Sequence, residues 1–325
     1  MTSNTGLPPG FESVEETVHR RFNNNTEIET AKHPYKEVEA MTNHRSGGVT
    51  DNYDPPPLKH DLRLHLVQSG TESGFETIEM MCEENTLRAT ALMASNWAGA
   101  GRLAAILSDC EPGYEANTLA SGLRWRLDRL HTADKLINAV EQEKAKGVTS
   151  HAFHIVMPQH TIPADKLHES NPITMNRWLR RLVQRHLPQP ATGWLFCQLH
   201  GEFEPTSNTY ILHFHGLVCG DYHVVLNGPV RAELTRQGSR HVRPNGIPKV
   251  RVPLRINPLR DVPRQVSYVL QSWWPARPVV ITERGEKRVR DKHRIPEPYH
   301  SQYLLWLHQF TFADIRLRMG MGNTW

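Results

Sequence analysis

Apolar residues recur at intervals of three and four positions over several stretches of the chain, which is the spacing of one face of a helix. Helices are therefore predicted over residues 77–97, 101–107, 118–143 and 171–186. Two more are predicted later in the chain, one from near Asn257 or Asp261 to Trp274, where Pro275 stops it, and one over residues 298–310.

Three strands are predicted from short apolar runs that are bounded by turn residues. The first covers residues 151–157 and is ended by Pro158. The other two lie within residues 194–220 and are joined by a polar turn over residues 205–208. The order in this part of the chain is therefore strand, helix, strand, strand.

This hairpin places five polar side chains on one of its faces. Pairing the two strands about their turn puts Gln198 opposite His215 and His200 opposite His213, with Glu202 further along the same face. Side chains alternate across a strand, so the imidazoles of His213 and His215 point in the same direction. Such a pair is half of a metal site, and the alternative is a pair of structural histidines with satisfied hydrogen bonds.

Charge is distributed unevenly along the 325 residues, although the formal net charge is only +4. Residues 1–80 carry 13 acidic and 7 basic side chains, whereas residues 229–294 carry 16 lysines and arginines against 5 acidic residues. So dense a basic segment suits the phosphate backbone of a nucleic acid, since a merely solvated surface usually mixes both signs. Earlier in the chain, Arg124, Arg126 and Arg129 are expected on the solvated face of their helix.

No stretch of the sequence has the pattern of a membrane span or of a signal-peptide core. The four cysteines show no C-x-x-C spacing, and Cys197 and Cys219 lie in apolar strand sequence, as small core residues do. A cytoplasmic protein without membrane contact is therefore expected. Residues 1–60 are rich in Asn, Thr, Glu and Pro and are predicted to be a largely disordered tail.

Three places in this sequence resemble the HUH endonucleases: the strand over residues 153–157, the triplet His213-Phe214-His215 that follows Gln198-Leu199-His200, and a helix that carries Tyr268. The resemblance covers about residues 151–294 and is to the rolling-circle replication initiators of that superfamily. It implies an α+β fold in which helices flank a central antiparallel sheet. The predicted parts are a tail (1–60), a helical accessory region (61–147), the nuclease domain (148–294) and a C-terminal helix and tail (295–325).

The resemblance also implies a metal site. In that family paired histidines hold a divalent ion, here His213 and His215, and an oxygen of Gln198 is the expected third ligand. Glu202 and Gln271 are the alternatives for that position. A mixed nitrogen and oxygen set without thiolates suits Mn²⁺ or Mg²⁺ rather than structural Zn²⁺. The ion is expected to offset the charge that grows on a phosphodiester under attack.

A helix-borne tyrosine cuts one DNA strand in that family and stays bound to its 5′ end, and Tyr268 is the matching residue. A phenol, with an ordinary pKa of about 10, needs a nearby metal ion or basic side chains to act as a nucleophile. The replication initiators commonly have Y-x-x-K, but Gln271 stands at the lysine position, and Arg264 is a candidate substitute. Tyr299 and Tyr303 rank second as nucleophiles, because their spacing resembles that of the two-tyrosine members.

Basic residues flank the proposed nucleophile and are the expected DNA contacts. They are Arg240, Arg243, Lys249, Arg251, Arg255, Arg264, Lys287, Arg288 and Arg290. Trp273 and Trp274 follow Tyr268 closely, and they are expected either to stack on unpaired bases or to cap the hydrophobic core.

The leading hypothesis is a metal-dependent single-strand DNA endonuclease and strand transferase that initiates rolling-circle replication of a plasmid, phage or mobile element. Its expected partners are single-stranded DNA at a replication origin and a host helicase and polymerase. Three alternatives remain open: a relaxase or transposase of the same superfamily, a non-catalytic basic regulator that binds nucleic acid, and a phosphoesterase that uses water as the nucleophile.

Overall fold

The computed structural model describes residues 78–109, 117–241, 252–282, 285–289 and 292–322, without the side chains of residues 281–288. The disorder predicted for residues 1–60 lies outside these ranges. No helix within them has the length and apolar content that crossing a membrane requires.

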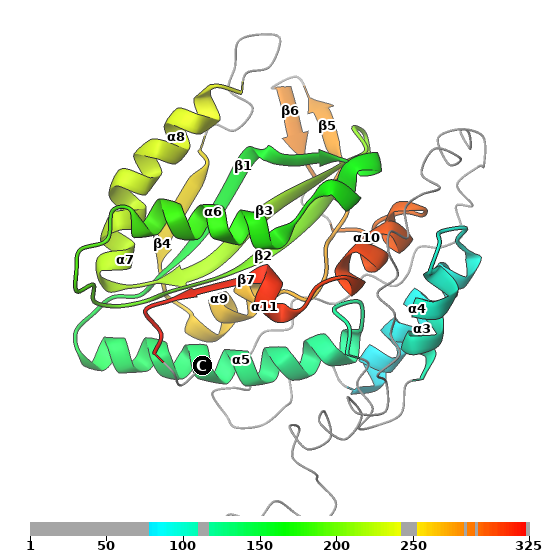
Figure 1. Ribbon diagram of the computed structural model, residues 1–325, viewed down its shortest axis with the longest axis horizontal. Helices are drawn as coiled ribbons and strands as arrows, with labels where there is room; N and C mark the ends of the chain where they lie inside the picture. The colour runs from blue at the N-terminus through cyan, green and yellow to red at the C-terminus, as the bar shows by residue number, and fades with distance from the viewer. Residues whose placement is uncertain (1–77, 110–116, 242–251, 283–284, 290–291, 323–325) are drawn as a thin grey trace, which may run out of the picture.

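Five strands form the central sheet, and all their pairings are antiparallel, so the expected α+β class with a central antiparallel sheet is confirmed. In spatial order the strands are β4 (Leu254–Pro258), β1 (His151–Pro163), β3 (Thr209–Val218), β2 (Leu195–Glu204) and β7 (Arg316–Met319) (Figure 1). Two short strands, β5 (Val279–Thr282) and β6 (Gly285–Arg288), form a separate hairpin. β3 is therefore the central strand.

The hairpin of β2 and β3 has the predicted register. Gln198 pairs with His215 and His200 pairs with His213, and residues 205–208 form the turn. This register was predictable because the polar turn lies at a defined place and both strands have uninterrupted apolar flanks.

β1 is longer than predicted, because it continues past Pro158 to Pro163. Its pairing with β3 is interrupted between Val156 and Thr161 and then resumes. A proline lacks the N–H that a regular ladder needs, and an irregularity in the pairing is a place where that N–H is not required. The prediction that Pro158 ends the strand was therefore wrong.

One face of the sheet is covered by α6 (Pro172–Gln184), which crosses it in Figure 1. The side chain of Asn171 caps this helix by accepting a hydrogen bond from the backbone N–H of Ile173 at 2.9 Å. Leu179 of α6 belongs to the same hydrophobic cluster as Phe214 of β3. The predicted helix over residues 171–186 is thus confirmed.

The opposite face is covered by α5 (Gly122–Ala145) and α9 (Val262–Val269), which contact each other. Leu136 of α5 and Val266 of α9 share a second hydrophobic cluster with Phe196 of β2. The boundary predicted at residue 147 stays a prediction, but α5 on its N-terminal side packs in one cluster with the sheet.

Two further predicted helices, α3 (Ile78–Ala94) and α4 (Ala100–Ser108), are confirmed and lie beside α10 (Tyr299–His308), the predicted last helix (Figure 1). Buried Glu84 of α3 forms ion pairs with Arg88 and with Arg294. Burial alone would raise the pKa of Glu84, but the two guanidiniums hold it well below its usual value. This pairing ties the N-terminal helices to the C-terminal part of the chain.

Several short elements had no predicted counterpart. They are the 3₁₀ helix at Ala164–Glu169, α7 (Gly220–Val225), the π-helical turn at Leu226–Val230, α8 (Arg231–Ser239), α11 (Phe312–Ile315) and β7. The proline-broken basic stretch that begins near Val230 therefore contains a helix and an edge strand. The tail after the last helix adds β7 to the sheet, which its sequence alone did not indicate.

α9 ends earlier than predicted. Of the two predicted starts, Asn257 and Asp261, the second is observed, because Asp261 caps the helix, but the helix stops at Val269 rather than at Trp274. Beyond it the chain runs beside the end of β2, where the N–H of Phe203 donates to the carbonyl of Pro275 at 2.9 Å. Two carbonyl oxygens that a longer helix would use, those of Val269 and Gln271, instead lie within hydrogen-bond distance of side chains on β2. Their partners are His200 at 2.8 Å and Gln198 at 3.4 Å.

Gly201 of β2 allows Trp274 to pack against the sheet, since a Cβ at this position would lie 2.4 Å from the indole ring. Replacing Gly201 with alanine is expected to displace that buried ring and to lower the free energy of unfolding by roughly 1–3 kcal/mol. Urea unfolding would measure the loss. Gly228→Ala is the control, because a Cβ there would have no atom within 4 Å apart from its own chain neighbours and helix backbone. Equal stability losses in both variants would show that the close approach of Trp274 to Gly201 does not matter.

Candidate metal centre and adjoining pocket

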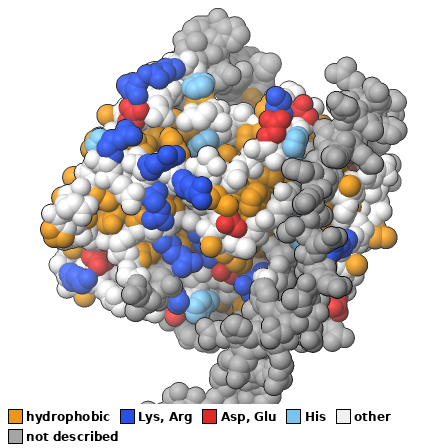
Figure 2. All heavy atoms as spheres, viewed as in Figure 1, with side chains coloured by type: hydrophobic (Ala, Val, Ile, Leu, Met, Phe, Trp, Pro, Cys, Tyr) orange, Lys and Arg blue, Asp and Glu red, His pale blue; other side chains and the backbone are white. Residues whose placement is uncertain are grey.

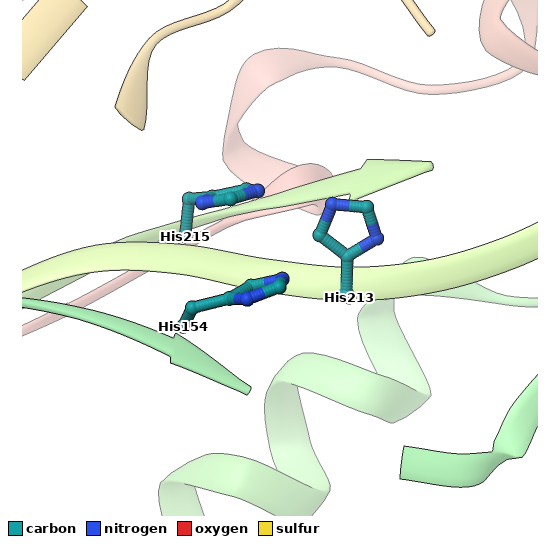
Figure 3. A group of neighbouring side chains, drawn as sticks. All are labelled: His154, His213 and His215. Carbon is teal, nitrogen blue, oxygen red and sulfur yellow. The ribbon is translucent and has the colours of Figure 1, made fainter. Parts of the chain in front are cut away.

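Three histidines converge on the face of the sheet that α5 and α9 cover. His154 of β1 pairs directly with His215 of β3, and His213 lies two residues before His215. One ring nitrogen of each lies within 4.8 Å of one ring nitrogen of the other two. The rings of His154 and His215 stack at 4.4 Å, and both extend toward the ring of His213 (Figure 3).

A backbone contact determines which nitrogen of His213 is available. Its Nδ1 lies 2.9 Å from the carbonyl oxygen of Ile211, which can only accept, so Nδ1 carries the proton. The lone pair is then on Nε2. Orientation of a ligating imidazole by a carbonyl on its other nitrogen is the usual arrangement in metal sites, and this donor set fits a divalent cation.

The surroundings keep His215 in the neutral form that binds metals. Burial, together with the neighbouring histidines and Lys292, lowers the pKa of His215 well below its ordinary value. A buried neutral imidazole has its lone pair free for a cation at neutral pH.

His154 was missed as a candidate ligand, although its strand was predicted. The only signal in the sequence was that side chains alternate along β1. This alternation fixes the face of the strand from which His154 points, but it does not say which strand pairs with β1. That pairing brings residues about 60 positions apart in the sequence into contact, and it belongs to the tertiary structure.

The three predicted third ligands all have other partners. Gln198 accepts a hydrogen bond from Arg316 through Oε1 at 2.9 Å, and Gln271 accepts one from Lys292 at 3.1 Å. Glu202 forms a salt bridge of 2.9 Å with Arg277. The Oε1 atom of each side chain therefore already accepts a hydrogen bond, whereas His154 lies within the cluster.

His200 holds the helix that carries the proposed nucleophile. Its Nε2 lies 2.8 Å from the carbonyl oxygen of Val269, the residue after Tyr268, so this nitrogen donates to α9. Burial and the neighbouring His213 lower the pKa of His200 to about 3, so the side chain is neutral at physiological pH. His200 thus links β2 to α9 and is a positioning residue.

Tyr268 lies next to the histidine cluster. Its ring centroid is 4.5 Å from that of His215, with the two rings nearly perpendicular, and the residue is 50% exposed. Partial burial and the negative charge of Glu202 raise the pKa of Tyr268. A phenol in this position needs compensating positive charge before it can ionise.

A pocket of about 520 Å³ opens beside Tyr268 and supplies such charge. Its lining includes His154, His215, Tyr268 and Trp273, and the basic residues Arg129, Arg255, Arg264 and Lys292. Arg255 and Arg264, two of the expected DNA contacts, therefore line the pocket that holds Tyr268. Arg243, Lys249, Arg251 and Arg290 lie outside the described residues, as do the side chains of Lys287 and Arg288.

Two basic residues of this pocket were not predicted. Lys292 places its Nζ 5.7 Å from the ring centroid of Tyr268 and 5.8 Å from that of Trp273. Arg129 of α5 is buried and donates to Ser267 at 3.2 Å, and Arg126 is buried too. The prediction that both arginines lie on a solvated face of the helix was therefore wrong. α9 and the sheet cover this side of α5, which helical spacing alone did not reveal.

The other aromatic candidates lie elsewhere. Tyr303 is buried against Trp274, and burial raises its pKa to about 12. Tyr299 packs on Phe203, and neither tyrosine lines the pocket. The two tryptophans have separate places, since Trp273 lines the pocket and Trp274 lies in the core.

None of the family models, curated proteins or solved structures that were compared with this chain matches it.

The buried histidines imply a pH-dependent stability. Burial and His213 lower the pKa of His160 to about 4, whereas unfolded histidine titrates near 6.5. Between about pH 4 and 6.5 the unfolded chain therefore binds more protons than the folded chain. The contribution of neutral His160 to the free energy of unfolding is complete above pH 6.5 and is lost as the pH falls toward 4. His160→Phe is expected to reduce the slope of unfolding free energy between pH 6.5 and 4.5 by up to about 1.4 kcal/mol per pH unit. Urea titrations would measure it, and an unchanged slope would contradict the assignment.

Proposed function

We propose that the protein is a metal-dependent single-strand DNA endonuclease and strand transferase of the HUH type, with Tyr268 as the nucleophile. On this proposal it initiates rolling-circle replication of a plasmid, phage or mobile element. The observation that carries the proposal is the 4.5 Å separation between the rings of Tyr268 and His215 beside a basic pocket.

The histidine cluster supports the metal requirement. His213 and His215 would hold the ion, and His154 would take the position first assigned to Gln198. A bound Mn²⁺ or Mg²⁺ supplies charge stabilisation to a phosphodiester under attack. Three nitrogen ligands would leave coordination positions open for oxygens from substrate and water.

The chain's own residues account for the other parts of the reaction. The Oη of Tyr268 attacks the phosphorus and loses its proton, an O–P bond forms, and the bond from phosphorus to the 3′ oxygen breaks. That oxygen takes up a proton and leaves as a hydroxyl. Lys292 and Arg264 line the pocket where positive charge would stabilise the phenolate and the phosphate. A phosphotyrosine ester replaces the phosphodiester, so a 3′ hydroxyl can later reverse the step without ATP.

Labelled DNA tests the proposal directly. The protein is incubated with Mn²⁺ and a library of single-stranded oligonucleotides of randomised sequence that carry a 3′ fluorophore. A covalent adduct that retains the 3′ label is expected, because the nucleophile keeps the 5′ phosphate of the downstream fragment. Tyr268→Phe should form less than about one thousandth of the adduct. Tyr299→Phe is the matched control and should form as much as the unaltered protein.

The other readings predict different outcomes. Metal-dependent cleavage without an adduct would identify water as the nucleophile and a hydrolytic phosphoesterase. DNA binding without cleavage under Mn²⁺ or Mg²⁺ would favour a non-catalytic regulator. Adduct formation by Tyr268→Phe, with loss of the adduct in Tyr303→Phe, would identify Tyr303 as the nucleophile.

A further inference from the structure

The exposed side of α6 carries four arginines, on the sheet face opposite the histidine cluster. They are Arg177, Arg180, Arg181 and Arg185, and all four are exposed. The sequence contains no acidic residue between Ser170 and Gly193. Figure 2 shows this face, where basic side chains form a diagonal row over α6 with few acidic side chains among them.

These charges are not neutralised within the described part of the chain. None of the four arginines forms an ion pair with a described residue, and the side chains of Arg180 and Arg181 donate to backbone carbonyl oxygens. Arg236 of α8, in contrast, pairs with Glu233 at 2.5 Å. The helix dipole favours cations only in the last turn, so it does not account for Arg177, which lies in the middle of the helix.

We propose that this surface binds the phosphate backbone of duplex DNA. Arg177, Arg181 and Arg185 recur every four residues and form a stripe with steps of about 6 Å along the helix. Guanidinium groups bind phosphate oxygens in a bidentate way, and arginine is the residue best suited to such contacts.

The same face is poorly suited to other anionic partners. Leu179, Leu182 and Val183 of α6 are buried, so the helix offers no apolar side for insertion into a lipid surface. Single strands are held by stacking on aromatic rings, but Trp178 is half-buried with its ring against His160. The helix thus presents charge without a stacking surface, which fits the backbone of a duplex.

Fluorescence anisotropy with a labelled 20-base-pair duplex of arbitrary sequence, in EDTA, tests this surface without cleavage. The triple variant Arg177→Gln, Arg181→Gln, Arg185→Gln is expected to bind at least about tenfold more weakly at low salt. The slope of log affinity against log salt should fall by about 2–3, because each phosphate contact contributes about 0.9. Lys135→Gln, Lys144→Gln, Lys146→Gln on α5 is the control of equal charge, with an expected slope change below about 1.

A variant with lysine at the same three positions retains the charge and should restore most of the salt slope, which separates binding from misfolding. Equal slopes in the glutamine triple variant and the α5 control would overturn the proposal. So would a loss confined to single-stranded DNA or to vesicles of phosphatidylserine and phosphatidylcholine. Adduct formation at Tyr268 should persist in the triple variant, so the two proposals can fail separately.

Discussion

Replacing His213 with alanine is expected to weaken Mn²⁺ binding by more than about 100-fold and to reduce single-strand cleavage by at least about a thousandfold. Loss of a residue that only orients a metal ligand costs about 10–100-fold in affinity, and loss of a ligand itself costs more. A thousandfold corresponds to about 4 kcal/mol of transition-state stabilisation, which is within what a metal ion supplies to phosphoryl chemistry. Isothermal titration with Mn²⁺ and the adduct assay measure the two effects.

The matched control is His131→Ala, which removes an exposed histidine of α5. It should bind Mn²⁺ and form adduct like the unaltered protein. If His213→Ala retained normal Mn²⁺ affinity, the cluster would be structural and the endonuclease proposal would lose its metal centre.

The third ligand is decided by a comparison of two variants. His154→Ala is expected to lose Mn²⁺ affinity nearly as severely as His213→Ala, because its ring stacks on His215 within the cluster. Gln198→Ala should keep that affinity, since the Gln198 oxygen is bound to Arg316. The reverse order of affinities would restore Gln198 as the ligand.

The largest expected effect on stability comes from Asp128→Ala. Asp128 of α5 forms an ion pair with Arg316 of β7, whose side chain is 1% exposed. Removing the carboxylate leaves a buried guanidinium without its counter-ion, which costs roughly 3–5 kcal/mol. Urea unfolding should show this loss.

Asp134→Ala is the control on the same helix, because Asp134 is exposed. Its stability should change by less than about 0.5 kcal/mol. The double variant Asp128→Leu, Arg316→Met should be more stable than Asp128→Ala alone, because it removes the buried charge as well as its partner. Equal unfolding free energies for Asp128→Ala and Asp134→Ala would show that the ion pair contributes little.

Much of the local structure was predictable because it depends on the spacing of apolar residues and on turn residues within a short stretch of sequence. The helix predicted from residue 171 begins there, with Asn171 as its cap, and the turn over residues 205–208 sets the pairing of His200 with His213. The end of α9 was not predictable in this way. It depends on contacts with β2, such as that of the Val269 carbonyl with His200, and β2 is far from α9 in the sequence.

The residues of the candidate site also fall into a part that one strand determines and a part that packing between distant segments determines. His213 and His215 share a face because side chains alternate along one strand, a constraint that needs no knowledge of neighbours. His154, Arg129 and Lys292 come from β1, from α5 and from the segment after β6, and only packing brings them to Tyr268.

By itself, therefore, the sequence determined the longer helices, three strands of the sheet, the hairpin register and one pair of imidazoles, since these follow from periodicity and turn residues over a short stretch. Only the tertiary structure decided the third histidine, the cations beside the tyrosine and the engagement of Gln198 by Arg316. The physical reason is that pairing and packing between distant segments depend on how each segment buries its apolar face. One local pattern of apolar and polar residues is compatible with several such arrangements.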